Sequence, residues 1–331
     1  MISIIIPFKN TAHFLPACLD SIRSQNTENW EVLAVNDHAS DDSFDLVTSY
    51  AQKDARIQVF QNKGSGIIPA LQTAYAYAKG NFITRMDSDD IMLPNRLKTM
   101  ANALHKAGLG YIAVGQVRYF SDRGISNGYQ RYEKWLNEMT AKGSNFTEIY
   151  KECVIPSPCW MVHRIDFDAC GGFSHNRYPE DYDLTFRFYE KGLKIIPCHE
   201  VLHQWRDYDT RTSRTHEHYA QNYFLDIKLH YFLKLDYDSQ RPLVIWGAGF
   251  KGKTIAKKLT AASIDFHWLC DNPNKINKKI YGKPMKHFSE LDTLKNPQSI
   301  ITVANEVAQK EIRSYLSKLG QKSIIDYYFF C

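Results

Sequence analysis

Short apolar runs alternate with helical patterns along the first hundred residues. Four short, mainly apolar runs have the length of buried strands. Between them, apolar positions recur at helical spacing over residues 14–22 and 67–78. The alternation predicts an α/β domain with a mainly parallel sheet and helices on both of its faces. The predicted strands cover residues 2–6, 32–35, 57–60 and 82–86.

Polar clusters follow three of these predicted strands directly. They cover Pro7 to Asn10, Asn36 to Asp42, and Asp87 to Asp90. In open α/β sheets, ligands bind outside the carboxyl ends of the strands, and parallel strands bring those ends to one edge. The pattern therefore predicts a binding site built from these three clusters.

The triplet Asp87-Ser88-Asp89 has the composition of a cation site. Two carboxylates at a strand end can converge on Mg²⁺ or Mn²⁺, which prefer oxygen ligands and can bind a diphosphate at the same time. The alternative is that Asp89 or Asp90 caps the helix that follows. Asp37 supplies a third acid at another strand end, where a nucleotide needs acceptors for its base and ribose.

Four segments in this order resemble family 2 glycosyltransferases over about residues 1–215. The run from Ile4 to Asn10 resembles that family's opening strand and its Pro-x-x-Asn signature. Val35 to Asp41 is similar to the family's Asn-Asp-Gly-Ser-x-Asp segment, and Asn62 to Asp90 is similar to the segment that contains its Asp-x-Asp motif. Gly171 to Phe173, followed by Pro179 to Leu184, is similar to its Gly-Gly-Phe and Glu-Asp-x-Asp-Leu block.

The resemblance implies a GT-A fold with a mixed, mainly parallel sheet. It also implies a nucleotide-sugar donor, with a UDP-sugar expected, and a Mn²⁺ or Mg²⁺ ion. Asp87 and Asp89 are the expected metal ligands. The expected donor-binding residues are Pro7, Phe8, Asn10, Asp37, Asn62, Gly66, Arg85, Asp87 and Ser88. The family often has Gly where His38-Ala39 stands, so the loop after Asp37 is expected to differ.

The same resemblance implies that Asp181 is the general base, with Glu180 beside it. Inverting glycosyl transfer needs a carboxylate that takes the proton of the acceptor hydroxyl. It also needs stabilisation of the charge on the leaving phosphate, which a metal ion provides. The alternative for Asp181 is a helix cap with no catalytic role.

The segment His203-Gln204-Trp205-Arg206 departs from the processive members of the family. Those members carry Gln-x-x-Arg-Trp and transmembrane helices, so we expect non-processive transfer. From this segment, Arg206 or Arg214 is expected to reach the diphosphate, and His203 the metal. The alternative is that these are solvated surface charges.

Aromatic residues make up 13% of the chain, and three of them are candidates for stacking on an acceptor sugar. These are Trp160, Tyr178 and Trp205, for which plain core packing is the alternative. An aromatic helix is predicted over residues 217–235. It could pack the two domains together, form a dimer, or rest on a membrane surface.

The strand and helix pattern restarts after the sequence Ser239 to Pro242, which predicts domains over 1–240 and 241–331. In the second, Rossmann-like domain, Gly247-x-Gly249-x-x-Gly252 follows a predicted strand and opens a helix. Asp271 stands about 20 residues further on, as a dinucleotide site requires. The alternative is a scaffold whose glycines only allow close packing of helix and strand.

Composition narrows the class of protein and its compartment. Lys and Arg exceed Asp and Glu by 41 to 36, a net charge of +5, which does not indicate nucleic acid as the main partner. We find no apolar run of about 18 residues and no leader, so we expect neither a spanning segment nor a signal peptide. Seven cysteines without a regular framework fit a reducing compartment. The expected location is the cytoplasm, or the inner face of the membrane.

The sequence therefore predicts an inverting, metal-dependent, non-processive glycosyltransferase that acts on a glycan or lipid-linked acceptor. Two other classes stay open. The glycine fingerprint allows a dinucleotide-dependent oxidoreductase. The second is a protein that binds nucleotide-sugars or a partner but catalyses no reaction. The presence of Asp37, Asp87, Asp89 and Asp181 argues against it, because such a protein would not need both the metal ligands and the base.

Overall fold

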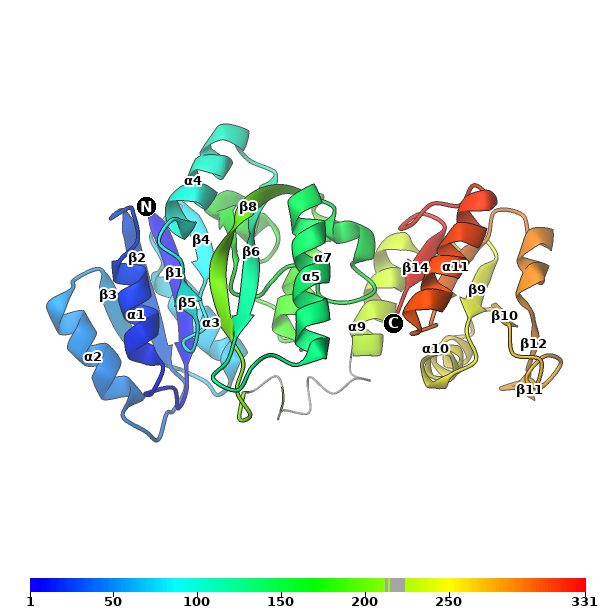
Figure 1. Cartoon of the computed structure of the whole chain (residues 1–331), viewed down its shortest axis with the longest axis horizontal. Coiled ribbons are helices and arrows are strands. Elements are labelled where there is room, and N and C mark those ends of the chain that lie inside the picture. Colours follow the sequence, from blue (N-terminus) through cyan, green and yellow to red (C-terminus); the bar gives the residue numbers. More distant parts are fainter. Residues whose placement is uncertain (212–213, 215–223) are drawn as a thin grey trace. The chain divides into compact units, whose positions relative to one another are not determined.

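A computed structural model describes residues 1–211, 214 and 224–331, and these form two compact units (Figure 1). The described part of the first unit is 1–145, 154–211 and 214. The second contains 146–153 and 224–331. The boundary predicted after residue 240 lies within the second unit, between η3 (Phe232–Asp236) and β9 (Leu243–Trp246).

The first unit is built on an eight-stranded mixed sheet with the order β3-β2-β1-β4-β7-β6-β8-β5. Strands β3, β2, β1 and β4 are parallel, as are β6 and β8, whereas β7 and β5 run against their neighbours. The strands are β1 (Ile2–Phe8), β2 (Trp30–Asn36), β3 (Ile57–Gln61), β4 (Phe82–Arg85), β5 (Ile91–Met92), β6 (Tyr111–Phe120), β7 (Trp160–His163) and β8 (Lys194–Arg206).

The four strands predicted near the N-terminus are confirmed. Ile4, Ile5 and Ile6 in the middle of β1 are fully buried, because β2 and β4 flank the strand and helices cover the sheet. Burial on both faces requires a continuous apolar run rather than alternation. β7 corresponds to a further strand that the sequence predicts over residues 161–163, whereas β5, β6 and β8 lie outside the predicted set.

Helices cover both faces of this sheet. Helix α3 packs on β1 and β2, and helix α5 lies along the long curved strands β6 and β8 (Figure 1). The helices are α1 (Leu15–Arg23), α2 (Ser43–Lys53), α3 (Ile67–Tyr77), α4 (Arg96–Ala107), α5 (Asn127–Lys142), α6 (Arg164–Ala169) and α7 (Glu180–Glu190).

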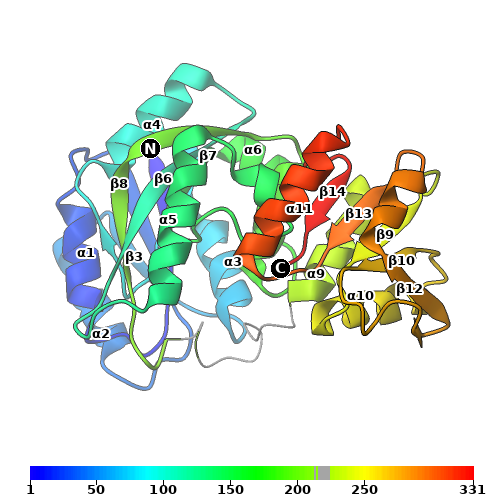
Figure 2. The same cartoon turned by 45° about the vertical axis from the view of Figure 1, so that its right-hand side comes forward.

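The second unit has its own sheet, with the order β11-β12-β10-β9-β13-β14. Its five parallel strands, numbered along the chain, follow the order 3-2-1-4-5 of doubly wound sheets. Helix α11 lies across one face (Figure 2), where Ile312 and Leu316 join the core. Beyond β9 and η3, the elements are α9 (Phe224–Tyr231), α10 (Phe250–Ala261), β10 (His267–Cys270), β11 (Lys279–Ile280), β12 (Lys283–His287), η4 (Phe288–Thr293), β13 (Gln298–Ile301), α11 (Glu306–Lys318) and β14 (Tyr327–Phe329).

A short segment from the middle of the chain completes the second unit. It begins within the 3₁₀ turn η1 (Asn145–Glu148), and Tyr150 stacks on Phe330 with ring centroids 5.4 Å apart. The buried Lys228 of α9 donates to the carbonyl oxygen of Lys151 at 2.7 Å. Residues 217–223 of the predicted aromatic helix lie outside the described residues, and 224–231 are helical. Within the described chain, we find no helix long and apolar enough to cross a membrane.

Candidate active site

Asp37 is the point at which three chain segments meet at the carboxyl edge of the first sheet. It follows β2, and its oxygen Oδ1 accepts hydrogen bonds from Asn62 Nδ2 at 2.6 Å and from the backbone N–H of Gly66 at 2.8 Å. Gly66 has φ +93°, which favours glycine. The second oxygen, Oδ2, lies 3.5 Å from the ammonium of Lys9, which follows β1. The structure thus brings the predicted residues Asp37, Asn62 and Gly66 together.

The other residues predicted to contact the donor base form hydrogen bonds between the loops at this edge of the sheet, or pack in its core. Asn10 Oδ1 accepts from the backbone N–H of Ser40 at 2.7 Å and so joins the loops after β1 and β2. Ser88 Oγ lies 3.0 Å from Thr11 Oγ1. Phe8 is buried in the core as the last residue of β1, and Pro7 is the half-buried residue before it.

Arg85 joins the acidic triplet to the start of α7. It is the last residue of β4, and its Nε donates to Asp87 Oδ1 at 3.0 Å. Its Nη1 donates to Glu180 Oε1, also at 3.0 Å, and both partners of this second pair are buried. One guanidinium therefore fixes the distance between two carboxylates that are 93 residues apart in the chain.

Asp181 lies in the first turn of α7 beside a small pocket. Its Oδ1 accepts from the backbone N–H of Tyr182 at 2.8 Å. Burial raises the pKa of the Asp181 carboxyl to about 7, and the charge of Glu180 adds to the shift while Arg85 opposes it. A carboxyl with this pKa can accept a proton near neutral pH. The pocket is lined by Arg85, Ile155, Ser157, Trp160, Phe173, Glu180, Asp181, Leu184, Thr185 and Phe188.

Asp89 and Asp90 complete the acidic loop after β4. Burial raises the pKa of Asp89 to about 7, and the Asp90 and Asp87 charges add to this. Arg211 and a hydrogen bond from the hydroxyl of Tyr208 act in the opposite direction on the same carboxyl. Neither Tyr208 nor Arg211 is among the predicted site residues.

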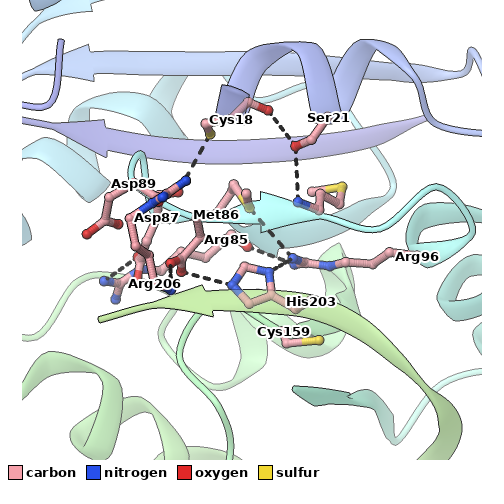
Figure 3. Close-up of polar contacts among 12 residues, drawn as sticks. Cys18, Ser21, Arg85, Met86, Asp87, Asp89, Arg96, Cys159, His203 and Arg206 are labelled. Carbon is pink, nitrogen blue, oxygen red and sulfur yellow. Dashed lines mark hydrogen bonds and ion pairs between the residues drawn. The ribbon is translucent and has the colours of Figure 1, made fainter. Parts of the chain in front are cut away.

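His203 lies in a fully buried chain of polar contacts with Arg96 (Figure 3). Arg96 Nη1 is 3.0 Å from His203 Nδ1, and His203 Nε2 is 2.9 Å from Asp90 Oδ2. Because a guanidinium can only donate, Nδ1 accepts and Nε2 carries the proton that it donates to Asp90. Burial and the charge of Arg96 lower the pKa of His203, so the ring is neutral. Both ring nitrogens are engaged in these contacts, and metal binding by His203 stays a prediction.

Arg206 contacts the acidic loop, whereas Arg214 has another partner. Arg206 Nε donates to the backbone oxygen of Asp89 at 2.7 Å, and its guanidinium lies over the rings of Phe14 and Phe120. Arg214 forms a bidentate pair with Asp207 at 2.9 and 2.7 Å. These contacts fit roles in holding the local loops, and contact of either arginine with a diphosphate stays a prediction.

The three candidate aromatic residues have different surroundings. Trp160 is almost fully buried and lines the pocket beside Asp181. Trp205 is buried and stacks on Tyr119, with ring centroids 5.0 Å apart. The hydroxyl of Tyr178 lies 3.2 Å from the position that a Cβ atom would have at Gly66. Of the three, Tyr178 reaches the donor-side loop.

A divalent cation at this edge would find carboxylate oxygens but few other ligands. Asp87 and Asp89 are oxygen donors of the kind that Mg²⁺ and Mn²⁺ prefer. Among the described residues, no group of three or more His, Cys, Asp or Glu side chains is placed to hold a metal ion. A metal here would therefore take its remaining ligands from water and a diphosphate.

In the second unit, two of the three fingerprint glycines are needed for packing. A Cβ atom at Gly247 would lie 2.4 Å from Thr302 Oγ1, and one at Gly252 would lie 2.2 Å from the backbone oxygen of Gly247. A Cβ atom at Gly249 would meet no atom within 4 Å. Asp271 is exposed directly after β10. The packing role explains Gly247 and Gly252, and a nucleotide site here stays a prediction.

Comparison with known proteins places the first unit in a family. Residues 3–171 match the model of glycosyl transferase family 2. Glycosyltransferase GlyG of Streptococcus pneumoniae serotype 4 is 34% identical over 223 residues, which cover 65% of this chain and 73% of GlyG. Three curated relatives, GlyG included, are matched over 58% to 73% of their own length, so the chain spans less than two thirds of some of them.

Two solved structures resemble the chain in fold. One is S. aureus TarS 1–349 in complex with UDP-GlcNAc, with a TM-score of 0.55 and 17% identity, covering 72% of this chain and 68% of that one. The other is the mannosyltransferase PcManGT from Pyrobaculum calidifontis in complex with GDP-Man and Mn²⁺. Its TM-score is 0.51 and its identity 18%, with coverage of 70% and 63%. These likenesses confirm the GT-A fold.

Proposed function

The chain belongs to glycosyl transferase family 2, and on that basis we propose that it performs inverting, metal-dependent, non-processive transfer of a sugar to a glycan or lipid-linked acceptor. The observation that carries the proposal is the double contact of Arg85. It holds the donor-side Asp87 and the acceptor-side Glu180, next to Asp181, at fixed separation. Positioning of this kind is what a displacement between two bound substrates requires.

In the proposed reaction, the acceptor hydroxyl oxygen attacks the anomeric carbon from the face opposite the diphosphate. The hydroxyl proton passes to a carboxylate oxygen of Asp181. The bond between the anomeric carbon and the diphosphate oxygen breaks, and its electron pair leaves on the nucleoside diphosphate. A base with a pKa of about 7 is suited to this transfer near neutral pH.

The metal in this proposal is Mn²⁺ or Mg²⁺, held by Asp87 and Asp89. When bound, it would neutralise charge that develops on the leaving diphosphate. PcManGT, which has the same fold, is described in complex with GDP-Man and Mn²⁺. That description supports the choice of ion.

The proposed donor is a UDP-sugar. The description of TarS in complex with UDP-GlcNAc supports this choice. We propose that the chain acts in the cytoplasm or at the inner face of the membrane, where nucleotide-sugars and lipid-linked acceptors meet. Single transfers are expected, because the segment around Arg206 lacks the Gln-x-x-Arg-Trp order of processive members.

Replacing Asp37 with asparagine tests the donor site. Oδ1 of Asp37 is held by Asn62 and Gly66, so the amide can keep those contacts and turn its NH₂ toward the nucleotide. An acceptor thereby becomes a donor, and we expect UDP to bind about 10- to 100-fold more weakly. The measurement is calorimetric titration with UDP. Asp45→Asn, at an exposed site on α2, is the matched control; equal affinity in both variants would remove Asp37 from the donor site.

The oxidoreductase alternative rests on the glycine fingerprint of the second unit. Its direct check is nicotinamide absorbance in the presence of the full chain and NADH. The non-catalytic alternative is separated from the proposed enzyme by release of nucleoside diphosphate from a sugar donor.

A further inference from the structure

Positive charge is concentrated in one stretch of the second unit. Residues 251–286 contain nine Lys and two Asp, a surplus that exceeds the net charge of +5 of the whole chain. Helix α10, which lies in this stretch, has four Lys and no acidic residue. Acidic side chains are favoured in the first turn of a helix, whereas α10 has Lys251 and Lys253 there. The charge therefore works against the helix dipole, and α10 itself gains no stability from it.

The outward face of α10 combines lysine side chains with an exposed aromatic ring. Phe250, Lys253 and Lys257 stand at positions i, i+3 and i+7, which share one side of a helix. Both lysines are exposed, and Phe250 is 63% exposed. Lys258, on another side of α10, pairs with Asp226 at 2.8 Å. Neither Lys253 nor Lys257 forms an ion pair within the part of the chain that the structure describes, so this face offers two charges and a ring to a partner.

The β11–β12 hairpin lies on the same side of the second sheet as α10. Leu269 joins the core under α11, so Trp268, its neighbour in β10, points to the opposite face. Trp268 Nε1 donates to the backbone oxygen of Gly247 at 2.8 Å, in the turn before α10. The ring of Tyr281, at the tip of the hairpin, stacks on that of Trp268, and Tyr281 is 46% exposed. A second exposed aromatic ring therefore stands on the α10 side.

The loop between β10 and β11 brings a further lysine to this side. Lys275 Nζ donates to the backbone oxygen of Ala248 at 2.7 Å, so the loop lies against the turn before α10. Lys278, near the end of this loop, is exposed and has no ion pair among the described residues. The exposed residues of these segments form what we call the basic face, which consists of Phe250, Lys253, Lys257, Lys278 and Tyr281.

We infer that the basic face binds a membrane surface that contains anionic lipids. Such a surface presents many phosphates in one plane, and it attracts lysines that come within about 10 Å at moderate salt. Exposed aromatic rings among lysines can bury apolar surface between the headgroups. Duplex nucleic acid would pair with the lysines but leave Phe250 in water. The inference rests on the proposed location at the inner face of the membrane, where it would hold the chain near a lipid-linked acceptor, and it requires no sugar transfer.

The test measures binding of the full chain to lipid vesicles by co-sedimentation. Vesicles of phosphatidylcholine and phosphatidylglycerol in equal parts are compared with vesicles of phosphatidylcholine alone, at about 0.1 M and about 1 M salt. We expect binding to the anionic vesicles only, and weaker binding at the higher salt. Lys253→Gln combined with Lys257→Gln should bind about 10- to 30-fold more weakly, because each lysine near such a surface contributes about fivefold. Lys310→Gln combined with Lys318→Gln, two exposed positions of α11, is the matched control and should bind as wild type.

Two further variants keep the test decisive. Phe250→Ser removes the ring without changing charge and should weaken binding at the lower salt about tenfold. Lys278→Gln lies outside α10 and should weaken binding about fivefold even if the α10 double variant folds poorly. No binding to anionic vesicles, an equal loss in the α11 control, or an unchanged affinity in Phe250→Ser would overturn the inference. Release from the vesicles by duplex DNA or by inorganic pyrophosphate at constant ionic strength would also overturn it. Failure of the proposed function would instead appear as no turnover of any nucleotide-sugar.

Discussion

Replacing Asp181 with asparagine is expected to reduce the rate of sugar transfer by about 10²- to 10⁴-fold, the range that a general base contributes. The amide cannot take the proton of the acceptor hydroxyl, but it has the shape of the carboxyl and can accept from Tyr182 as before. Binding of UDP should stay within about twofold, because Asp37 and its partners are untouched. The measurement is the rate of UDP release with donor and acceptor present, next to calorimetric titration with UDP.

The pH profile gives the same prediction a second readout. A base must be deprotonated, and burial raises the pKa of Asp181 to about 7. The wild-type rate should therefore rise as the pH increases through about 7, and the residual rate of Asp181→Asn should lack this step. Glu190→Gln, at the exposed end of α7, is the control and should keep both rate and profile. Near wild-type turnover in Asp181→Asn would remove Asp181 from the role of base.

Replacing Arg96 with methionine is expected to lower the free energy of unfolding by about 3–5 kcal/mol. Methionine fills much of the space but donates no hydrogen bond. Thr84 Oγ1, the backbone oxygen of Arg85 and His203 Nδ1 would each lose a donor in the interior, at about 1–3 kcal/mol for each acceptor left unpaired. The measurement is equilibrium unfolding in urea. The free energies of unfolding of wild type and variant are compared with the same m-value, the slope of free energy against urea concentration.

The control for Arg96 lies two residues away on the same helix. Lys98 is exposed on α4, and Lys98→Met should change the free energy of unfolding by no more than about 0.5 kcal/mol. If Arg96→Met is as stable as Lys98→Met, the buried contacts of Arg96 do not support the acidic loop as described.

The parts of the fold that the sequence predicts are those whose strands are buried on both faces. Residues 4–6 of β1, 32–35 of β2 and all of β9 are continuous apolar runs, because their surroundings exclude water on either side. β8 has no such signature: its side chains range from buried to exposed, and its pairing with β6 shifts register near Gly115. The sequence of β8 shows neither a continuous apolar run nor a strict alternation of apolar and polar residues, so its local pattern does not predict a strand.

The residues of the candidate site also fall into those that a local sequence pattern predicts and those that it does not. Asp37, Asp87 and Asp181 could be predicted, because each directly follows a strand or opens a helix within a short recognisable segment. The partners of the acidic loop could not, since they depend on contacts between distant segments. Arg96 and His203 are 107 residues apart, and neither the charge of Arg96 nor the ring of His203 indicates that each satisfies the other. Such pairings come from tertiary packing alone.

Turnover of nucleotide-sugars tests the central claim most directly. The full chain would be incubated with common UDP-, GDP- and dTDP-sugars and Mn²⁺, and the release of nucleoside diphosphate followed with and without EDTA. The account predicts release from at least one donor, a UDP-sugar, which EDTA suppresses and Asp181→Asn reduces. No release from any of these donors, with Mn²⁺ present and the chain folded, would contradict it.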